Sequence, residues 1–138
     1  MTDMLQVTFD CADVPAMVRF WSAALSYEPE SPPPGFDTWE DFARANGIPE
    51  DMWDAWGAAV DPAGRGPRFF FQRVPEGKTA KNRVHLDLRL SRRVGSDGLA
   101  SEVARLEGLG AERVDERDEM GTRWVVMRDV EGNELCVS

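Results

Sequence analysis

The stretch that decides the fold lies just past the middle of the chain and reads Lys81-Asn82-Arg83-Val84-His85-Leu86-Asp87-Leu88-Arg89-Leu90. Apolar and polar residues alternate strictly along its second half, which is typical of a β-strand with one face toward a core. The polar face carries His85, the only histidine in the chain, together with Asp87 and Arg89. An imidazole, a carboxylate and a guanidinium in one row are unusual on a plain solvent-exposed face. We therefore expect this face to line a cleft.

A second alternating stretch, residues 5–11, opens the chain and is followed by helix signals. Asp13 is a suitable N-cap, Pro15 fits the first turn, and apolar residues at helical spacing continue to Leu25. Residues 29–35 contain four prolines, which excludes a helix or a central strand. A capping box at residues 37–40 then predicts a helix to about residue 46.

Residues 29–54 form a segment rich in proline and tryptophan, which we interpret as an insertion that lies over a pocket. Trp39 and Trp53 would then contact the ligand. The simpler alternative is that both tryptophans are ordinary core anchors, because large aromatic side chains are usually buried for structural reasons.

The remaining pattern repeats the order strand, helix and three strands. In the first half, residues 56–60 and 68–74 predict a hairpin. In the second half, Ser96 or Asp97 caps a helix, and strands follow at residues 111–114, 122–127 and 133–137. Each half also contains an Asp-x-x-Gly turn, at residues 61–64 and 129–132.

This repeat predicts an α+β fold in a single domain, residues 1–138, made of two βαβββ modules. Module one spans about residues 4–76 and contains the insertion, and module two spans about residues 80–138. We expect the modules to form a curved mixed sheet around a concave cleft, with the helices outside.

Composition excludes several classes of partner. The net charge is −9 and the pI about 4.6, so neither nucleic acid nor an anionic membrane is a suitable partner. No apolar run approaches the ~18 residues of a membrane span. The two cysteines, Cys11 and Cys136, form no CxxC motif, and no signal peptide is evident, which predicts reduced thiols in a cytoplasmic protein.

The layout of these strands and helices, closed by the turn at residues 128–134, resembles the glyoxalase-like families of the vicinal-oxygen-chelate superfamily. That superfamily also holds bleomycin- and fosfomycin-resistance proteins and extradiol dioxygenases. The resemblance spans nearly the whole chain except the insertion, and its most specific element is the closing turn, although Val130 stands where the family usually has proline. Residues 70–78 and 82–87 are similar to a subgroup of small glyoxalase-like proteins.

The resemblance implies a small-molecule ligand, a homodimer and, in metal-using members, a divalent ion such as Ni²⁺, Zn²⁺, Mn²⁺ or Fe²⁺. Carried over to this sequence, the ligand positions are Gln6, His85, Cys136 and Gln72, with Phe70 in place of Gln72 if the strand register shifts by two. Two amides and a thiol suit such an ion poorly, so a metal-free site is an equal alternative.

Three functions follow from these residues. The first is a metal-dependent lyase, isomerase or dioxygenase. The second is a metal-free enzyme in which His85 or Glu134 acts as acid or base. The third is a non-catalytic binding or resistance protein that sequesters a small molecule. For substrate contacts we predict Thr8, Phe70, Asp87, Trp124, Trp39 and Trp53.

Overall fold

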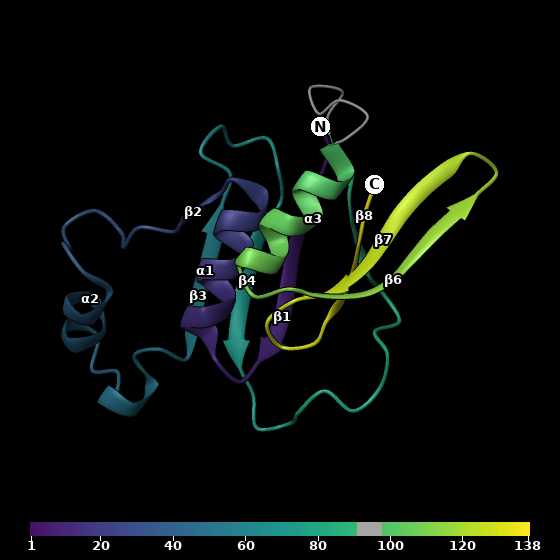
Figure 1. The fold of residues 1–138 in the computed structure, drawn as a ribbon. Helices are drawn as coiled ribbons and strands as arrows, with labels where there is room; N and C mark the ends of the chain where they lie inside the picture. The colour runs from purple at the N-terminus through teal and green to yellow at the C-terminus, as the bar shows by residue number, and fades with distance from the viewer. Residues whose placement is uncertain (91–97) are drawn as a thin grey trace. The chain divides into compact units, whose positions relative to one another are not determined.

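The computed structural model describes residues 1–90 and 98–138, which form two compact units, Met1–Gly77 and Lys78–Ser138. Each unit has a strand, then a helix, then three strands, and each contains its own four-stranded mixed sheet (Figure 1). The predicted α+β fold of two βαβββ modules is therefore confirmed. Within the described ranges, the helices are too short and too polar to cross a bilayer.

The sheet of the first unit has the order β1-β4-β3-β2, with β1 parallel to β4 and the other pairs antiparallel. Its elements are β1 (Gln6–Cys11), α1 (Val14–Leu25), β2 (Glu28–Pro29), β3 (Trp56–Val60) and β4 (Arg68–Arg73). No sequence pattern predicts β2. It contains a proline and lies at the sheet edge, where a missing backbone N–H is tolerated.

Helix α1 covers one face of this sheet (Figure 1). As predicted, the Asp13 side chain caps it, accepting a hydrogen bond from the Ala16 N–H at 3.0 Å. Trp21 of α1 lies 5.3 Å, between ring centroids, from both Phe9 and Phe69. These contacts place the aromatic core of the first unit between α1 and the sheet, and leave the opposite face of the sheet available for other contacts.

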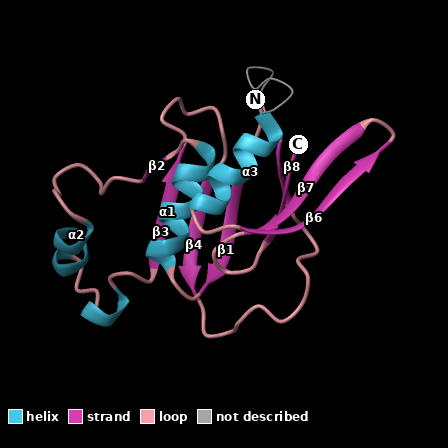
Figure 2. Ribbon diagram, viewed as in Figure 1, coloured by secondary structure: helices cyan, strands magenta, loops and turns pink. Residues whose placement is uncertain are grey.

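The insertion contains helix α2 (Trp39–Ala45) and a 3₁₀ turn, η1 (Glu50–Met52), both visible as helical segments in Figure 2. Helix α2 begins within the predicted capping box, and its cap is Thr38, whose hydroxyl accepts a hydrogen bond from the Asp41 N–H at 3.1 Å. The insertion therefore has regular structure of its own, as its sequence indicates.

The second unit has the same strand order as the first, β5-β8-β7-β6, again with the first and last strands parallel. Its elements are β5 (Leu86–Leu88), α3 (Gly98–Gly108), β6 (Glu112–Glu119), β7 (Thr122–Arg128) and β8 (Glu134–Val137). Its buried side chains alternate along β7 and β8 and include Val103 and Leu106 of α3. The predicted caps Ser96 and Asp97 lie outside the described residues.

The two Asp-x-x-Gly turns are built in the same way. The Asp61 carboxylate accepts hydrogen bonds from three backbone N–H groups, those of Ala63, Arg65 and Gly66. The Asp129 carboxylate accepts bonds from the backbone of residues 131 and 133. These turns bring the last two strands of each unit together, so the predicted repeat extends to the turn chemistry.

The strand predicted over residues 84–90 is shorter in the structure, where β5 covers only Leu86–Leu88. The Asn82 N–H, which a longer strand would pair with backbone, donates instead to the Glu134 carboxylate at 2.9 Å. Val84, predicted on the apolar face, is 80% exposed. Before His85, a hydrogen bond to the Glu134 side chain of β8 thus replaces backbone pairing between strands.

Strand β6 is longer than predicted, since it continues to Glu119. All eight of its residues are exposed. The hairpin with β7 closes at Met120 and Gly121, whose positive φ angles of 52° and 76° are typical of a tight hairpin turn. The sequence of β6 is almost entirely charged, so it lacks the apolar alternation by which a strand is recognised.

Candidate functional site

The face of the first sheet opposite α1 carries the residues predicted for this half of the molecule. Gln6, Thr8, Phe70 and Gln72 all alternate with the side chains that face α1. The strand register places Thr8 beside Phe70 and Gln6 beside Arg68. The structure therefore gathers these predicted residues on one surface of the first unit, as their spacing indicates.

A pocket of about 240 Å³ lies against this surface, and we name it the aromatic pocket. The sheet contributes Trp56, Arg68 and Phe70, and the insertion contributes Glu30, Trp39, Phe42, Ala43, Ile48, Met52 and Trp53. The insertion thus lines a pocket, as its composition suggested. Neither Trp39 nor Trp53 belongs to the buried core, and Trp39 is 40% exposed, so the core-anchor alternative does not hold.

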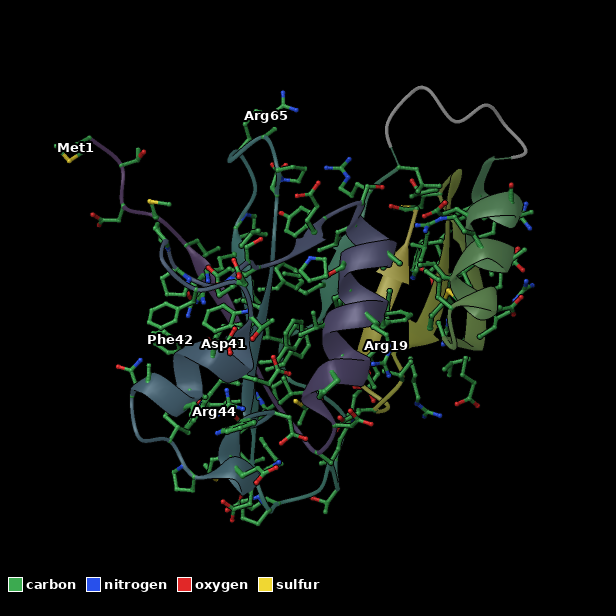
Figure 3. All side chains as sticks on the ribbon, turned by 90° about the vertical axis from the view of Figure 1, so that its left-hand side faces the viewer. Met1, Arg19, Asp41, Phe42, Arg44 and Arg65 are labelled. Carbon is green, nitrogen blue, oxygen red and sulfur yellow. The ribbon has the colours of Figure 1, made fainter. Side chains whose placement is uncertain are left out.

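The two tryptophans of the insertion are fixed through their ring N–H groups. Trp39 donates to the Glu30 carbonyl oxygen at 2.9 Å, and Trp53 donates to the Ile48 carbonyl oxygen at the same distance. Phe42 packs edge-on against Trp39, and the Arg44 guanidinium lies 5.2 Å from the centre of the Trp53 ring system. Figure 3 shows Phe42 and Arg44 on helix α2. Because both indole N–H groups are bonded to backbone, these side chains offer the pocket mainly apolar ring surface.

The polar end of the pocket is an ion pair between Arg68 and Glu30. The guanidinium makes two bonds to the carboxylate, at 3.0 Å from Nε and 2.6 Å from Nη2. A third bond, of 2.8 Å, runs from Nη1 to the Gln6 amide oxygen, and the Arg68 Cζ atom lies 5.1 Å from the Phe70 ring centre. Such a bidentate pair has a fixed geometry and balances its own charge.

In the second unit, the side chains of His85, Asp87 and Cys136 come together. Their ligating atoms all lie within 4.8 Å of one another, and we name them the His–Asp–Cys cluster. The parallel pairing of β5 with β8 sets Asp87 directly opposite Cys136. His85 Nδ1 lies 3.4 Å from an Asp87 oxygen. Burial, together with the neighbouring Asp87 carboxylate, raises the pKa of the Cys136 thiol.

Glu134 lies on the open face of β8 with Cys136, but its carboxylate is bonded to residues outside the His–Asp–Cys cluster. Its carboxylate accepts hydrogen bonds from Lys78 Nζ at 3.0 Å and from the Asn82 N–H at 2.9 Å. Burial alone would raise the pKa of the Glu134 carboxyl, but these bonds outweigh it and lower the pKa to about 2. A carboxylate this acidic and this well bonded is a weak base at neutral pH, so its geometry favours a structural role.

The four ligand positions implied by the family resemblance differ in how well they suit a metal ion. The Gln6 oxygen already accepts a bond from Arg68, and the Gln72 amide donates to Asp10 at 2.6 Å. Neutral amides also bring no charge to offset the desolvation of a cation. His85 and Cys136 have Asp87 beside them, which completes a nitrogen, oxygen and sulfur donor set of the kind that binds Zn²⁺. The donor chemistry therefore fits a metal in the second unit alone.

The other predicted contact of the second unit, Trp124, lies toward the hairpin. Its parity along β7 matches that of Val126, whose partner on β8 is Cys136, so Trp124 belongs to the open face. Its own partner is Arg117 of β6. The open face also borders a depression of about 720 Å³ lined largely by charged side chains, among them Lys78, Lys81 and Arg128.

Of the lining residues of the aromatic pocket, only Trp39, Trp53 and Phe70 were predicted from the sequence. Arg68 has the same strand parity as Phe70, so alternation could have placed it on the open face. Trp56 could have been found in the same way, from the hairpin that pairs β3 with β4. Glu30 lies in the proline-rich segment, where no periodic signal exists.

Comparisons with known proteins agree with this architecture. The family model of the glyoxalase-like domain matches residues 6–138. Fosfomycin resistance protein FosX from Listeria monocytogenes, solved with Mn(II) and 1S,2S-dihydroxypropylphosphonic acid, has a TM-score of 0.66 at 11% identity, covering 99% of this chain and 89% of that one. A glyoxalase/bleomycin resistance protein/dioxygenase family enzyme from Burkholderia phytofirmans PsJN gives 0.66 at 12% identity, covering 99% and 97%.

A third structure, a possible glyoxalase from Bacillus cereus, gives a TM-score of 0.64 at 12% identity, covering 99% of this chain and 98% of that one. A comparison with curated proteins found no match. At these identities the solved structures show the fold, and the functional argument rests on the side chains described above.

Proposed function

Because the chain belongs to the glyoxalase-like domain family, we propose that it is an enzyme of the lyase, isomerase or dioxygenase type that acts on a small organic molecule. Its reacting groups are those of the His–Asp–Cys cluster, which hold a divalent metal ion. The observation that supports this proposal is the approach of three different ligating atoms within 4.8 Å on one sheet face.

The donor set selects among the metals of the family. A thiolate and an imidazole favour Zn²⁺, Ni²⁺ or Fe²⁺ over Mn²⁺, which prefers oxygen ligands. Three protein ligands leave room for a substrate atom, as in catalytic zinc sites, and a bound ion would supply Lewis acidity there. Cys136 would hold the ion as the thiolate, so metal uptake would release the thiol proton.

Two carboxylates also support the geometry of the cluster. Asp87, which is itself one of the ligands, faces the His85 imidazole and the Cys136 thiol and so orients both side chains. Glu134 anchors the backbone of Asn82, three residues before His85. In the metal-free form of the same proposal, the His85 imidazole itself is the acid or base.

Metal analysis of the purified protein tests the proposal directly. The protein is prepared without chelator, loaded separately with Zn²⁺, Ni²⁺, Fe²⁺, Mn²⁺ and Co²⁺, and desalted before elemental analysis. We expect about one equivalent of Zn²⁺ and, with Co²⁺, an absorption band that reports thiolate coordination. His85→Ala and Asp87→Ala should lose the metal, and Cys136→Ser should lose the Co²⁺ band.

The matched control is Asp115→Asn, which removes an exposed carboxylate from β6 of the same unit. It should keep the full equivalent of metal. If the wild-type protein takes up no ion under any loading condition, or if Asp115→Asn loses the metal as readily as Asp87→Ala, the metal-dependent proposal fails.

A second candidate function, binding without catalysis, is favoured by the aromatic pocket. Fixed apolar ring surface with a single polar pair is typical of small-molecule binding sites and contains no evident reacting group. A protein that sequesters a small molecule would show saturable ligand binding, no metal requirement and no product. Analysis of the ligand after incubation separates this function from catalysis.

A further inference from the structure

We infer that the aromatic pocket selects uncharged aromatic molecules of one or two rings that carry a hydrogen-bond-accepting oxygen. The inference extends the proposed action on a small organic molecule by giving the chemical class of the ligand. It depends only on contacts within the first unit, so it can be tested without metal.

The size and the walls of the pocket set the ring system. A volume of about 240 Å³ is below the ~300–1,000 Å³ of pockets that take drug-sized ligands. Aromatic side chains approach from both sides, with Trp56 and Phe70 on the sheet and Trp39, Phe42 and Trp53 on the insertion. Offset or edge-on stacking on such rings favours a flat aromatic ligand over an aliphatic one.

The charge balance of the pocket excludes a charged ligand. Among the described residues that line it, Glu30 and Arg68 are the only acidic and basic ones, and each neutralises the other through a bidentate pair. An anion or a cation entering the pocket would lose its hydration without meeting an unpaired opposite charge. An uncharged ligand binds without this desolvation cost.

The remaining hydrogen-bond donors specify an oxygen on the ligand. A guanidinium has five N–H donors, and among the described residues the Arg68 group uses three of them, two toward Glu30 and one toward Gln6. Two N–H groups of Arg68 are therefore available to an acceptor. A ketone, ester or hydroxyl oxygen attached to the ring system satisfies them without adding charge.

Three probes with the same ring system and different charge test the inference. They are 2-acetylnaphthalene, which is neutral, 2-naphthoate, which is anionic, and 2-naphthylmethylammonium, which is cationic. Binding is measured by isothermal titration calorimetry on the full chain with EDTA present. We expect saturable binding of 2-acetylnaphthalene, at least ~10-fold tighter than either charged probe.

Removing one charge of the pair should change this preference. In Glu30→Gln the Arg68 guanidinium loses its counter-charge, so we expect 2-naphthoate to bind about tenfold tighter while 2-acetylnaphthalene changes less than about twofold. The matched control is Asp41→Asn, which removes an exposed carboxylate from α2 outside the pocket. It should leave the affinities of all three probes unchanged.

Phe70, which lines the pocket from β4, gives an independent check. Phe70→Ala should weaken 2-acetylnaphthalene binding about tenfold through lost ring contact, and Phe70→Leu, which keeps apolar bulk, should weaken it less. Absence of saturable binding, tighter binding of 2-naphthoate to the wild-type protein, or equal responses of Glu30→Gln and Asp41→Asn would each overturn the inference. Since EDTA is present throughout, failure here leaves the metal proposal standing, and failure of metal uptake leaves this result unaffected.

Discussion

The two units of the molecule share a topology but differ in the chemistry of their open faces. In both, the first and last strands are parallel neighbours, and an aspartate turn joins the last two strands. The open face of the first unit holds aromatic side chains and an insertion, whereas that of the second holds the His–Asp–Cys cluster and charged residues. Alternate residues of a strand face opposite sides of the sheet. The buried side chains can therefore stay apolar and stabilise the fold while the side chains of the open face differ between the units.

The largest expected losses of stability come from mutations on the buried faces of the two sheets. Phe71 in the first unit and Leu135 in the second are fully buried. We expect Phe71→Ala to lower the free energy of unfolding by about 3–5 kcal/mol, and Leu135→Ala by about 2–5 kcal/mol. Urea denaturation followed by circular dichroism measures both.

Val126→Ala, on the open face of β7, is the control for these core variants and should cost less than about 1.5 kcal/mol. If Val126→Ala lowers the free energy of unfolding as much as Leu135→Ala does, the open face also contributes to stability. The proposed difference between the two faces would then be contradicted.

A smaller loss is expected where α1 lies close to β3. A Cβ atom at Gly57 would lie 2.9 Å from Val18 Cγ2 and 3.0 Å from Val14 Cγ1. We expect Gly57→Ala to lower the free energy of unfolding by about 1–3 kcal/mol, because both valines must move. Gly108→Ala in α3, where no atom lies within 4 Å, is the control and should be neutral or slightly stabilising. Thermal unfolding of both variants checks the difference.

The Glu134 carboxylate predicts a pH dependence of stability specific to the second unit. Its pKa is lowered to about 2 in the folded protein, below the ordinary value of 4.5. Its stabilising contribution is therefore complete above pH 4.5 and is lost as the pH falls toward 2. We expect the stability difference between the wild-type protein and Glu134→Gln to shrink over this range. Melting temperatures measured at intervals between pH 6 and pH 2 test this, and a constant difference would contradict it.

The smallest effect is expected on the charged hairpin of the second unit. Arg123 forms an exposed ion pair with Glu116 across β6 and β7. We expect Arg123→Ala to cost less than about 1 kcal/mol, since exposed pairs contribute little in water. The loss should diminish further in high salt. A larger, salt-independent loss in urea denaturation would show that the arginine contributes through packing instead.

The parts of the fold with periodic sequence were predictable, and the parts held by individual contacts were not. Alternation located β1, β4 and the buried strands of the second unit, and caps located α1 and α2. The residue at which β5 begins could not be predicted, because it depends on the Glu134 side chain accepting a hydrogen bond from the Asn82 N–H. β6 has no apolar signal, because all its residues are exposed.

The same distinction applies to the candidate sites: residues on alternating strands were predictable, and residues placed by single contacts were not. Strand parity placed Phe70, His85 and Cys136 on open faces, whereas composition left open whether Trp39 and Trp53 line a pocket or anchor a core. The Arg68–Glu30 pair depends on the path of the insertion, which no local pattern specifies. The homodimer and the cytoplasmic location stay predictions.

The parallel pairing of first and last strands also has a consequence for biosynthesis. Gln6 pairs with Arg68, so the first sheet cannot close until most of its unit has been made. All four of its strands, however, lie before residue 78. The first unit can therefore complete its sheet while the second is still being translated, and its slow non-local pairing is separated in time from that of the second.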